Sequence, residues 1–482
     1  MNESVGPRRE RPPRQAGWWA WPLGLAFLGL FIPWALAAWF GFPGIGGADP
    51  GMWEAAALGS FQGHSSPVAP LFPALIALLV KLTGLGWARA GQTIAAVAFA
   101  TLGPACFLLA RRLGASPPLA ALAGLLPLLE PWLALGALQC QPDSLSALAF
   151  VLAMVAASGW LDTRRWPWLL ALVVVIGLLP QVREHAPPVA LGLLVLLAVA
   201  PGAWGARAGR LGLGVVALAL APLLLGEPLG LPWEQHWVQL RWGEVVQHFF
   251  ETGAPAFLAG TPQAFREEFM VAYARGDRLG VAWLHASLSF HSGWSPWLWL
   301  LPGLAGWLLM GRRRWVLFLG FLPLLAVPAG AQQPRHVAVL APLAIACWIA
   351  ALPRFRPPER LLLVVSSLAL GLLCCFNLSR AAYDHMLHSE LRGRLEDFAA
   401  ELCLRTSPQA VAVGGNQRPL IYCDRRQADR SEIDNQGLPA FWIGPMPEQH
   451  PDDWQELKDV GWVVLRMQND MYPVYQRVPP TR

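Results

Sequence analysis

The stretch GGADPGMWE, residues 46–54, directly follows the first long apolar segment of the chain, residues 18–42. It places two carboxylates, Asp49 and Glu54, among small residues that let a backbone turn closely. His64 follows in the same connection. If the flanking apolar segments are membrane helices, these three ionisable groups lie at a membrane surface, where each of them needs an explanation.

The composition is that of a polytopic membrane protein. Of the 482 residues, 55% are hydrophobic and 14% are charged, and the mean hydropathy is +0.41. Soluble domains carry about 25% charged residues, so a water-soluble fold of this composition would expose too much apolar surface. The 25 Trp residues suit anchoring at membrane interfaces. The net charge of +5 is dispersed in short clusters between apolar segments, which does not indicate a nucleic-acid partner.

Eleven apolar windows are expected to span the membrane, because a spanning helix needs about 20 apolar residues. They are residues 18–42, 87–110, 117–138, 144–161, 166–180, 186–200, 211–229, 295–310, 315–330, 337–351 and 361–376. The first window follows four arginines and is too long for the apolar part of a signal peptide. Residues 1–17 are therefore expected to form a basic cytoplasmic tail before an uncleaved span.

The arginines support this assignment. With the N-terminus in the cytoplasm, every connection expected on that side contains arginine, whereas the short outer connections hold few cations. The cytoplasmic clusters are Arg111 with Arg112, Arg164 with Arg165, Arg207 with Arg210, Arg312 to Arg314, and Arg354 with Arg356 and Arg360. The pattern holds only if residues 67–83, which contain Pro70 and Pro73 and end near Lys81, do not cross. We expect a helix there in the outer interface.

Two outer connections are long, residues 43–86 and 230–293. The second contains two amphipathic patterns and forms either a lid on the membrane surface or a soluble connector. We expect a transmembrane domain over residues 18–379 and a small extracytoplasmic α/β domain over residues 380–482, where charged residues become common. Its expected elements are helices over 390–404 and 452–459 and strands over 410–413, 420–422 and 462–465. Cys403 and Cys423 either form a disulfide or remain free thiols.

Ionisable groups near the outer membrane surface come from several connections that open on one face. They are Asp49, Glu54, His64, Glu130, Asp143, Arg183, Glu184, His185, Arg335 and His336. A shared site would explain why the outer connections are so uneven in charge. We therefore predict one pocket on the far side of the bilayer, with Asp49 facing it.

The acids have two interpretations each. Asp49 is a helix N-cap, a general base that takes a proton from an acceptor hydroxyl, or both. Glu54 assists the site or is a solvated acid of the following helix. Asp143, in QPDS, caps the next span or holds a substrate hydroxyl, a metal or a neighbouring arginine. Glu130 lies about 12 Å below the outer end of its span, so its carboxyl group is neutral or structurally paired.

Two basic residues are candidates for binding a phosphate group. Arg183, in QVREH, interrupts two short apolar half-runs and binds a lipid phosphate or pairs internally with Glu184 or Glu130. Arg335, in QQPRH, is the second phosphate candidate, and we place His64, His185 and His336 among the substrate-binding residues. No zinc pattern or phosphate loop is present in the sequence. Asp49 with Asp143 or Glu54 suits a divalent cation, although their spacing does not demand one, so no cofactor is predicted with certainty.

The order of several motifs resembles the superfamily of dolichyl-phosphate-mannose protein mannosyltransferases and aminoarabinose transferases, which have the GT-C fold. The likeness covers about residues 17–350. It rests on SPVAPLFP at 66–73, LLVKLTG at 78–84, ARAG at 88–91, ARRLG at 110–114, QPD at 141–143 and PRH at 334–336. The tail resembles the small extracytoplasmic domain often appended in that superfamily. The resemblance implies an all-helical GT-C-like domain in the bacterial inner membrane.

The resemblance also implies an inverting transfer of a sugar from a polyprenyl-phosphate donor to an acceptor lipid, glycan or protein. In such enzymes the first outer loop carries the catalytic acidic residue, which Asp49 matches. Asp143 matches an acidic position at the start of a later span, and Arg335 matches a basic position near the lipid phosphate. The superfamily often has two adjacent acids in the first loop, and here the second is Pro50. Either Glu54 replaces it, or metal use is lost, or the chain is a non-catalytic member.

Two other functions stay open. A transporter or flippase for a lipid-linked sugar would share the cavity and the cations but would need no base. Transporters more often show matched halves with interrupted helices, and the sequence shows no such symmetry. A structural or assembly protein of the cell envelope would use the outer domain to bind a partner.

Overall fold

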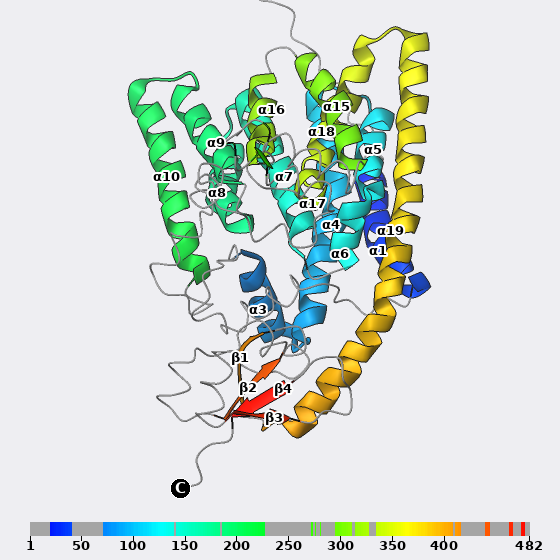
Figure 1. Cartoon of the computed structure of the whole chain (residues 1–482). Coiled ribbons are helices and arrows are strands. Elements are labelled where there is room, and N and C mark those ends of the chain that lie inside the picture. The colour runs from blue at the N-terminus through cyan, green and yellow to red at the C-terminus, as the bar shows by residue number, and fades with distance from the viewer. Residues whose placement is uncertain are drawn as a thin grey trace, which may run out of the picture.

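The computed structural model describes a helical bundle with a small sheet at one end (Figure 1). The described residues are 20–40, 71–138, 141–183, 186–226, 271–272, 275, 280, 295–310, 314–326, 334–407, 410–415, 439–443, 462–465 and 474–477. Most of the two long outer connections lies outside these ranges, as do the strand predicted over 420–422 and the helix predicted over 452–459.

All eleven predicted spans contain helix. The helices are α1 Ala20–Phe40, α3 Leu71–Thr83, α4 Trp87–Leu113, α5 Pro117–Leu125, η1 Leu126–Leu129, α6 Pro131–Leu138, α7 Asp143–Thr163, α8 Trp166–Val182, α9 Pro187–Val199, α10 Trp204–Gly226, α15 Ser295–Leu308, α16 Arg314–Phe321, η5 Leu322–Ala326, α17 Pro334–Ala338, α18 Ala341–Ala351, η6 Leu352–Arg354 and α19 Pro357–Arg405. Helix is the expected result, since a chain in lipid must satisfy its backbone polar groups internally.

Several helices are long and apolar enough to cross a membrane. Within the described ranges four meet this description: Arg89–Leu113, Asp143–Thr163, His336–Arg354 and Pro357–Cys374. A bent pair, Pro117–Leu129 with Pro131–Leu138, makes a fifth. The protein is therefore an integral membrane protein, and the figure of eleven crossings stays a prediction because the other helices do not meet this description over their described residues.

The bend between residues 117–129 and residues 131–138 has a cause in the local sequence. Pro131 has no backbone N–H and disfavours helical geometry in the residue before it. Glu130 accordingly has φ −75° and ψ 116°, an extended conformation, between η1 and α6. The two segments meet at 61°. The sequence thus puts an acidic residue at the joint of a broken helix.

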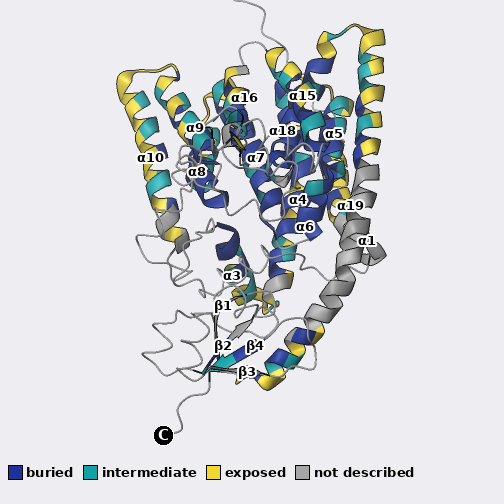
Figure 2. Ribbon diagram, in the orientation of Figure 1, coloured by how far each residue is buried: buried dark blue, intermediate teal, exposed yellow. Residues whose placement is uncertain are grey.

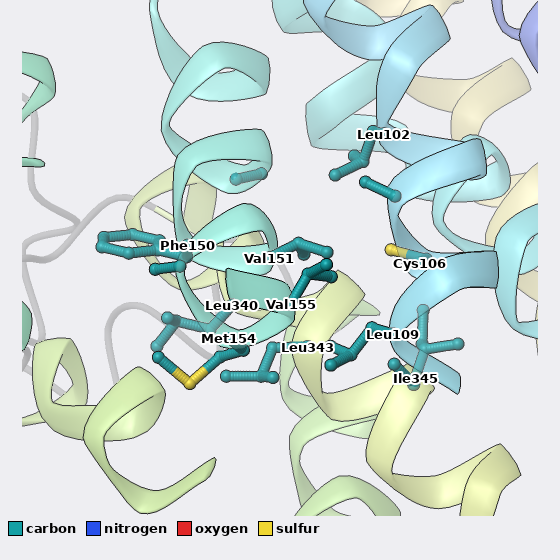
Figure 3. Packing of buried hydrophobic residues seen from close by; sticks show 14 of the residues in the cluster. Leu102, Cys106, Leu109, Phe150, Val151, Met154, Val155, Leu340, Leu343 and Ile345 are labelled. Carbon is teal, nitrogen blue, oxygen red and sulfur yellow. The ribbon is translucent and has the colours of Figure 1, made fainter. Parts of the chain in front are cut away.

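The core of the bundle lies where α4, α7 and α18 meet. Leu102 and Leu109 of α4 face Val151 and Val155 of α7, with Leu343 of α18 beside them (Figure 3). Buried residues fill this centre, while exposed residues follow the outer faces of α10 and α19 (Figure 2). Lipid tails are as apolar as these side chains, so close packing rather than hydrophobic burial has to hold such helices together.

The bundle has two chemically different ends. α19 runs along the bundle and continues to the sheet (Figure 1). At the end far from the sheet, Arg112 of α4 stacks on Trp168 of α8, and Arg210 of α10 donates to the carbonyl oxygen of Ala200 after α9. Three of the arginine-containing connections therefore meet at one end, as the assignment of the spans requires.

Helix α3 lies between the bundle and the sheet (Figure 1). Phe72 and Ile76 pack against Ala90 of α4, and α3 also contacts α8 and α10. Leu78 and Leu82 are exposed on its other side. This position suits the predicted interfacial helix, which stays a prediction because the structure contains no membrane.

The tail contains a four-stranded sheet. β1 Val411–Gly415, β2 Ala440–Ile443, β3 Trp462–Leu465 and β4 Val474–Arg477 follow the order β1-β2-β4-β3. β1 and β2 are parallel and the other pairs are antiparallel. The strands predicted over 410–413 and 462–465 are confirmed, whereas β2 and β4 were not predicted.

Helix α19 connects the bundle to this sheet without a break at residue 380, the predicted domain boundary. The helix predicted over 390–404 is the last part of α19. Cys403, near its end, forms a disulfide, which removes the free-thiol alternative for this residue. Cys423, its predicted partner, lies outside the described residues.

The close contact between α15 and α18 is testable. A Cβ atom on Gly306 would lie 2.7 Å from the carbonyl oxygen of Cys347 and from the Cα atom of Trp348, which are backbone atoms that cannot turn away. Gly306→Ala should therefore destabilise the protein by about 1–3 kcal/mol, measured by thermal unfolding in detergent. Gly209→Ala is the control, since nothing lies within 4 Å of that position. Equal melting temperatures for the two variants would contradict this packing.

Candidate functional site

A buried ion pair joins α7 to α8. A guanidinium nitrogen of Arg183, Nη2, donates to Oδ1 of Asp143. Asp143 is 0% exposed and Arg183 is 4% exposed. A charge taken out of water is very costly unless an opposite charge and hydrogen bonds accompany it. The pair therefore holds the first residue of α7 against the residue that follows α8.

Local structure explains how both residues reach this place. α7 begins at Asp143, and the N-cap position before it is occupied by Pro142, not by the acid. The helix N-terminus still favours a carboxylate, because its free N–H groups carry partial positive charge. Arg183 leaves α8 in an extended conformation, with φ −156° and ψ 149°. The capping interpretation of Asp143 is thus wrong, and the alternative of a neighbouring arginine is confirmed. Arg183 pairs with Asp143, an acid that the internal-pairing alternative had not named.

The second oxygen of Asp143 faces α6. A Cβ atom placed on Gly136 would lie 3.6 Å from Oδ2, and the hydroxyl of Ser144 donates to the carbonyl oxygen of Leu133 at 3.1 Å. Oδ2 is buried, and it has no hydrogen-bond partner within the part of the chain that the structure describes. One oxygen of the carboxylate therefore orients Arg183, and the other is open to a donor that the described residues do not supply.

Glu130 forms a second buried polar contact. Its side chain is 0% exposed, and Oε1 accepts a hydrogen bond of 2.8 Å from the hydroxyl of Ser295, the first residue of α15. The other oxygen, Oε2, has no hydrogen-bond partner in the described ranges. The predicted structural pairing of Glu130 is confirmed, with a serine hydroxyl as its partner.

The helix that carries Arg335 and His336 lies beside these groups. α17 packs against α6, α7 and α15, which bear or adjoin Glu130, Asp143 and Ser295. The side chain of His336 is half-buried, while the structure describes only the backbone of Arg335. Four connections of the chain thus bring polar groups to one region of the bundle.

The remaining predicted residues are not placed. Asp49, Glu54, His64, Glu184 and His185 lie outside the described residues. The shared pocket that includes Asp49 therefore stays a prediction. In the described ranges, no group of three or more His, Cys, Asp or Glu side chains is arranged to hold a metal ion, and the divalent cation stays untested because it rests on Asp49.

Sequence reasoning missed four polar groups in this region. Ser295 was taken only as the start of a span, and its contact with Glu130 joins residues 165 positions apart. Gln141 and Gln181 are each 7% exposed and flank Asp143 and Arg183. Trp299 follows Ser295 by one helical turn, and its buried Nε1 has no partner among the residues described. Gln141 lies two residues before Asp143, and Gln181 lies two residues before Arg183. This shared spacing is the sequence signal that could have identified the two glutamines.

No protein-family model matches this chain, and no curated protein matches it. The fold is similar to crystal structures of ArnT from Cupriavidus metallidurans. The structure bound to undecaprenyl phosphate has a TM-score of 0.59 and 13% identity, over 97% of this chain and 99% of that chain. The apo structure has a TM-score of 0.56 and 15% identity, over 96% of this chain and 98% of that chain. This likeness confirms the expected GT-C-like fold over nearly the whole chain.

The buried Asp143–Arg183 pair predicts that the protein loses stability when one of the two charges is removed. Asp143→Asn leaves Arg183 buried without its acid, and losing one partner of such a pair costs about 3–5 kcal/mol. The variant should lose that much stability in detergent, while the double variant Asp143→Leu with Arg183→Leu should recover most of it. Glu401→Gln is the matched control, since the Glu401–Arg405 pair is partly exposed and should contribute about 1 kcal/mol or less. A loss for Asp143→Asn no larger than that of the control would mean that the pair is not buried.

Proposed function

We propose that this protein is a membrane glycosyltransferase that transfers a sugar from a polyprenyl-phosphate donor to an acceptor at the sheet end of the bundle. The observation that carries the proposal is the buried Asp143–Arg183 pair beside α17, within a fold similar to ArnT. One ArnT structure is described as bound to undecaprenyl phosphate, which supports a polyprenyl phosphate as the ligand class here.

The arginines bind the phosphate of the donor. A guanidinium presents several N–H donors in one plane, which matches phosphate oxygens. Asp143 accepts from Nη2 of Arg183 and so fixes the direction of the remaining donors. Arg335, on the neighbouring α17, supplies the second positive charge. Together they stabilise the negative charge of the departing polyprenyl phosphate, which is greatest after the bond to the sugar has broken.

Asp49 acts as the general base. It accepts the proton of the acceptor hydroxyl while that oxygen forms a bond to the anomeric carbon of the sugar. The bond between this carbon and the phosphate oxygen breaks, and its electron pair leaves with the polyprenyl phosphate. Attack from the face opposite the phosphate inverts the anomeric configuration. Glu54, His64, His185 and His336 bind hydroxyl groups of the substrates.

The exposed face of α3 guides the prenyl chain. Leu78 and Leu82 are exposed on a helix that packs against α4, α8 and α10 near the sheet end. The disulfide at Cys403 supports an outer location for this end, because disulfides persist in oxidising compartments. The reaction then takes place at the extracytoplasmic face, with the N-terminus in the cytoplasm.

A transporter of lipid-linked sugars is the second candidate. The helix broken at Glu130 favours it, because interrupted helices line the binding sites of many transporters. A transporter moves the intact donor, whereas a transferase releases polyprenyl phosphate. The product therefore separates the two functions.

The test uses purified protein in proteoliposomes and a polyprenyl-phosphate donor with a labelled sugar. Asp49→Asn should lower the release of polyprenyl phosphate by a factor of about 10² or more, because general-base catalysis typically contributes that much. Asp397→Asn is the control, since it removes one exposed carboxylate from α19. Full activity in Asp49→Asn would remove Asp49 as the base. Transport of intact donor without release of polyprenyl phosphate by the wild-type protein would favour the transporter.

A further inference from the structure

Arginine and tryptophan side chains stack at the end of the bundle opposite the sheet. The Cζ atom of Arg112 lies 4.0 Å from the ring centroid of Trp168. Arg164 and Arg210 lie 4.6 Å and 5.4 Å from the ring centroid of Trp160. We call these residues, together with Arg165, the arginine–tryptophan cluster. It gathers four positive charges from α4, α7, α8 and α10.

The backbone holds this cluster in place. Arg164 ends α7 in the left-handed conformation, with φ 54°, which is uncommon for a residue other than glycine. Its N–H donates to the carbonyl oxygen of Trp160 at 2.8 Å. Trp168 packs closely over Gly159, where a Cβ atom would lie 2.6 Å from the indole ring. A guanidinium stacked on a ring keeps its N–H edge available for an anion.

Helix capping explains some arginines at this end. Arg111 donates to the carbonyl oxygen of Ala115, Arg207 to that of Gly202, and Arg210 to those of Leu197 and Ala200. The guanidinium groups of Arg164 and Arg165 are different. Both residues are exposed, and neither guanidinium donates a hydrogen bond to the residues that the structure describes. Because both residues are exposed, an anion at the surface can reach their donors.

Apolar surface extends from the cluster along the bundle. α8 and α10 pack side by side, and both expose large apolar side chains on their outer faces. These are Leu170 and Val174 on α8 and Leu213, Val216 and Leu220 on α10. Trp166 and Trp204, near the cluster, are 72% and 83% exposed, as is typical of residues at a membrane interface. A ligand that fits both surfaces has an anionic head and long apolar chains.

We propose that the arginine–tryptophan cluster binds the phosphate of an anionic phospholipid, with Arg164 and Arg165 as the donors. The acyl chains lie along the exposed faces of α8 and α10. A zwitterionic phospholipid has the same phosphate, but it carries its own ammonium group, which four nearby arginines repel. This site is at the opposite end of the bundle from Asp143 and Arg183, so it is independent of the proposed sugar transfer.

The chain offers a matched control at the same end. Arg354 donates to the carbonyl oxygen of Ala350, and Arg360 donates to that of Phe355. Arg356 pairs its backbone N–H with Glu359. This group carries a similar charge and has an acid nearby, as Arg164 and Arg165 have in Asp162, but capping contacts occupy Arg354 and Arg360. Removing Arg354 and Arg356 therefore removes as much charge as removing Arg164 and Arg165.

The experiment measures lipid binding to the purified full chain by native mass spectrometry. Phosphatidylglycerol and phosphatidylcholine with identical acyl chains are titrated separately, and the wild-type protein should prefer phosphatidylglycerol. Arg164→Gln with Arg165→Gln should weaken binding of phosphatidylglycerol about 30-fold, since each basic group near an anionic lipid contributes about 1 kcal/mol. Arg164→Lys with Arg165→Lys should weaken it less, because the charge stays and the planar donors are lost. Arg354→Gln with Arg356→Gln should have little effect.

Four results would contradict the proposal. Equal binding of the two lipids to the wild-type protein would exclude an anionic-lipid site, whatever the variants do. An equal loss in the control variant would indicate diffuse attraction to the whole end. Full binding by the lysine variant would exclude guanidinium recognition of the phosphate. Displacement of the lipid by inorganic phosphate would indicate a site for a soluble anion.

Discussion

One pair of opposite charges, removed from water, organises the sheet end of the bundle. Asp143 and Arg183 are separated by two helices in the sequence, and each charge offsets the cost of burying the other. Their contact fixes the start of α7 against the end of α8, and α7 in turn packs on α4, α6 and α17. The helix that carries Arg335 and His336 thus packs against α7, whose first residue sets the direction of the Arg183 guanidinium. Such preorganisation is what the binding of a phosphate requires, because no charge has to be moved when the ligand arrives.

Arginine side chains have different surroundings at the two ends of the bundle. At the sheet end, a carboxylate neutralises Arg183, and the surroundings are buried. At the other end, indole rings and helix carbonyls support the guanidinium groups of Arg112, Arg164 and Arg210, which stay near the surface. The first arrangement suits a substrate phosphate in an enclosed site, and the second suits a lipid head group at an interface. The broken helix at Glu130 adds a second buried acid, which accepts a hydrogen bond from the hydroxyl of Ser295.

Apolar periodicity and length were enough to predict the helices, because a chain in lipid has no other way to satisfy its backbone. The same reasoning could not say which acid meets which base. Arg183 was expected near Glu130 or Glu184, and its contact with Asp143 depends on how α7 packs against α8, which local sequence does not encode. Ser295 gave no sign that it faces Glu130. In the tail, β2 and β4 are four residues long and were missed, since AFWI lacks a clear alternation and VYQR is too short to show a period. Asp49, Glu54, His64 and His185, taken from sequence, lie outside the described residues.

The account depends on a phosphate site built on Arg183 and faced by Asp49. A cryo-electron microscopy structure of the protein in lipid nanodiscs with added polyprenyl phosphate tests it most directly. The account predicts density for the phosphate within hydrogen-bonding distance of the Arg183 guanidinium, with α17 alongside and the Asp49 carboxylate facing the same cavity. Phosphate density elsewhere, or an Asp49 side chain directed into bulk solvent, would contradict it.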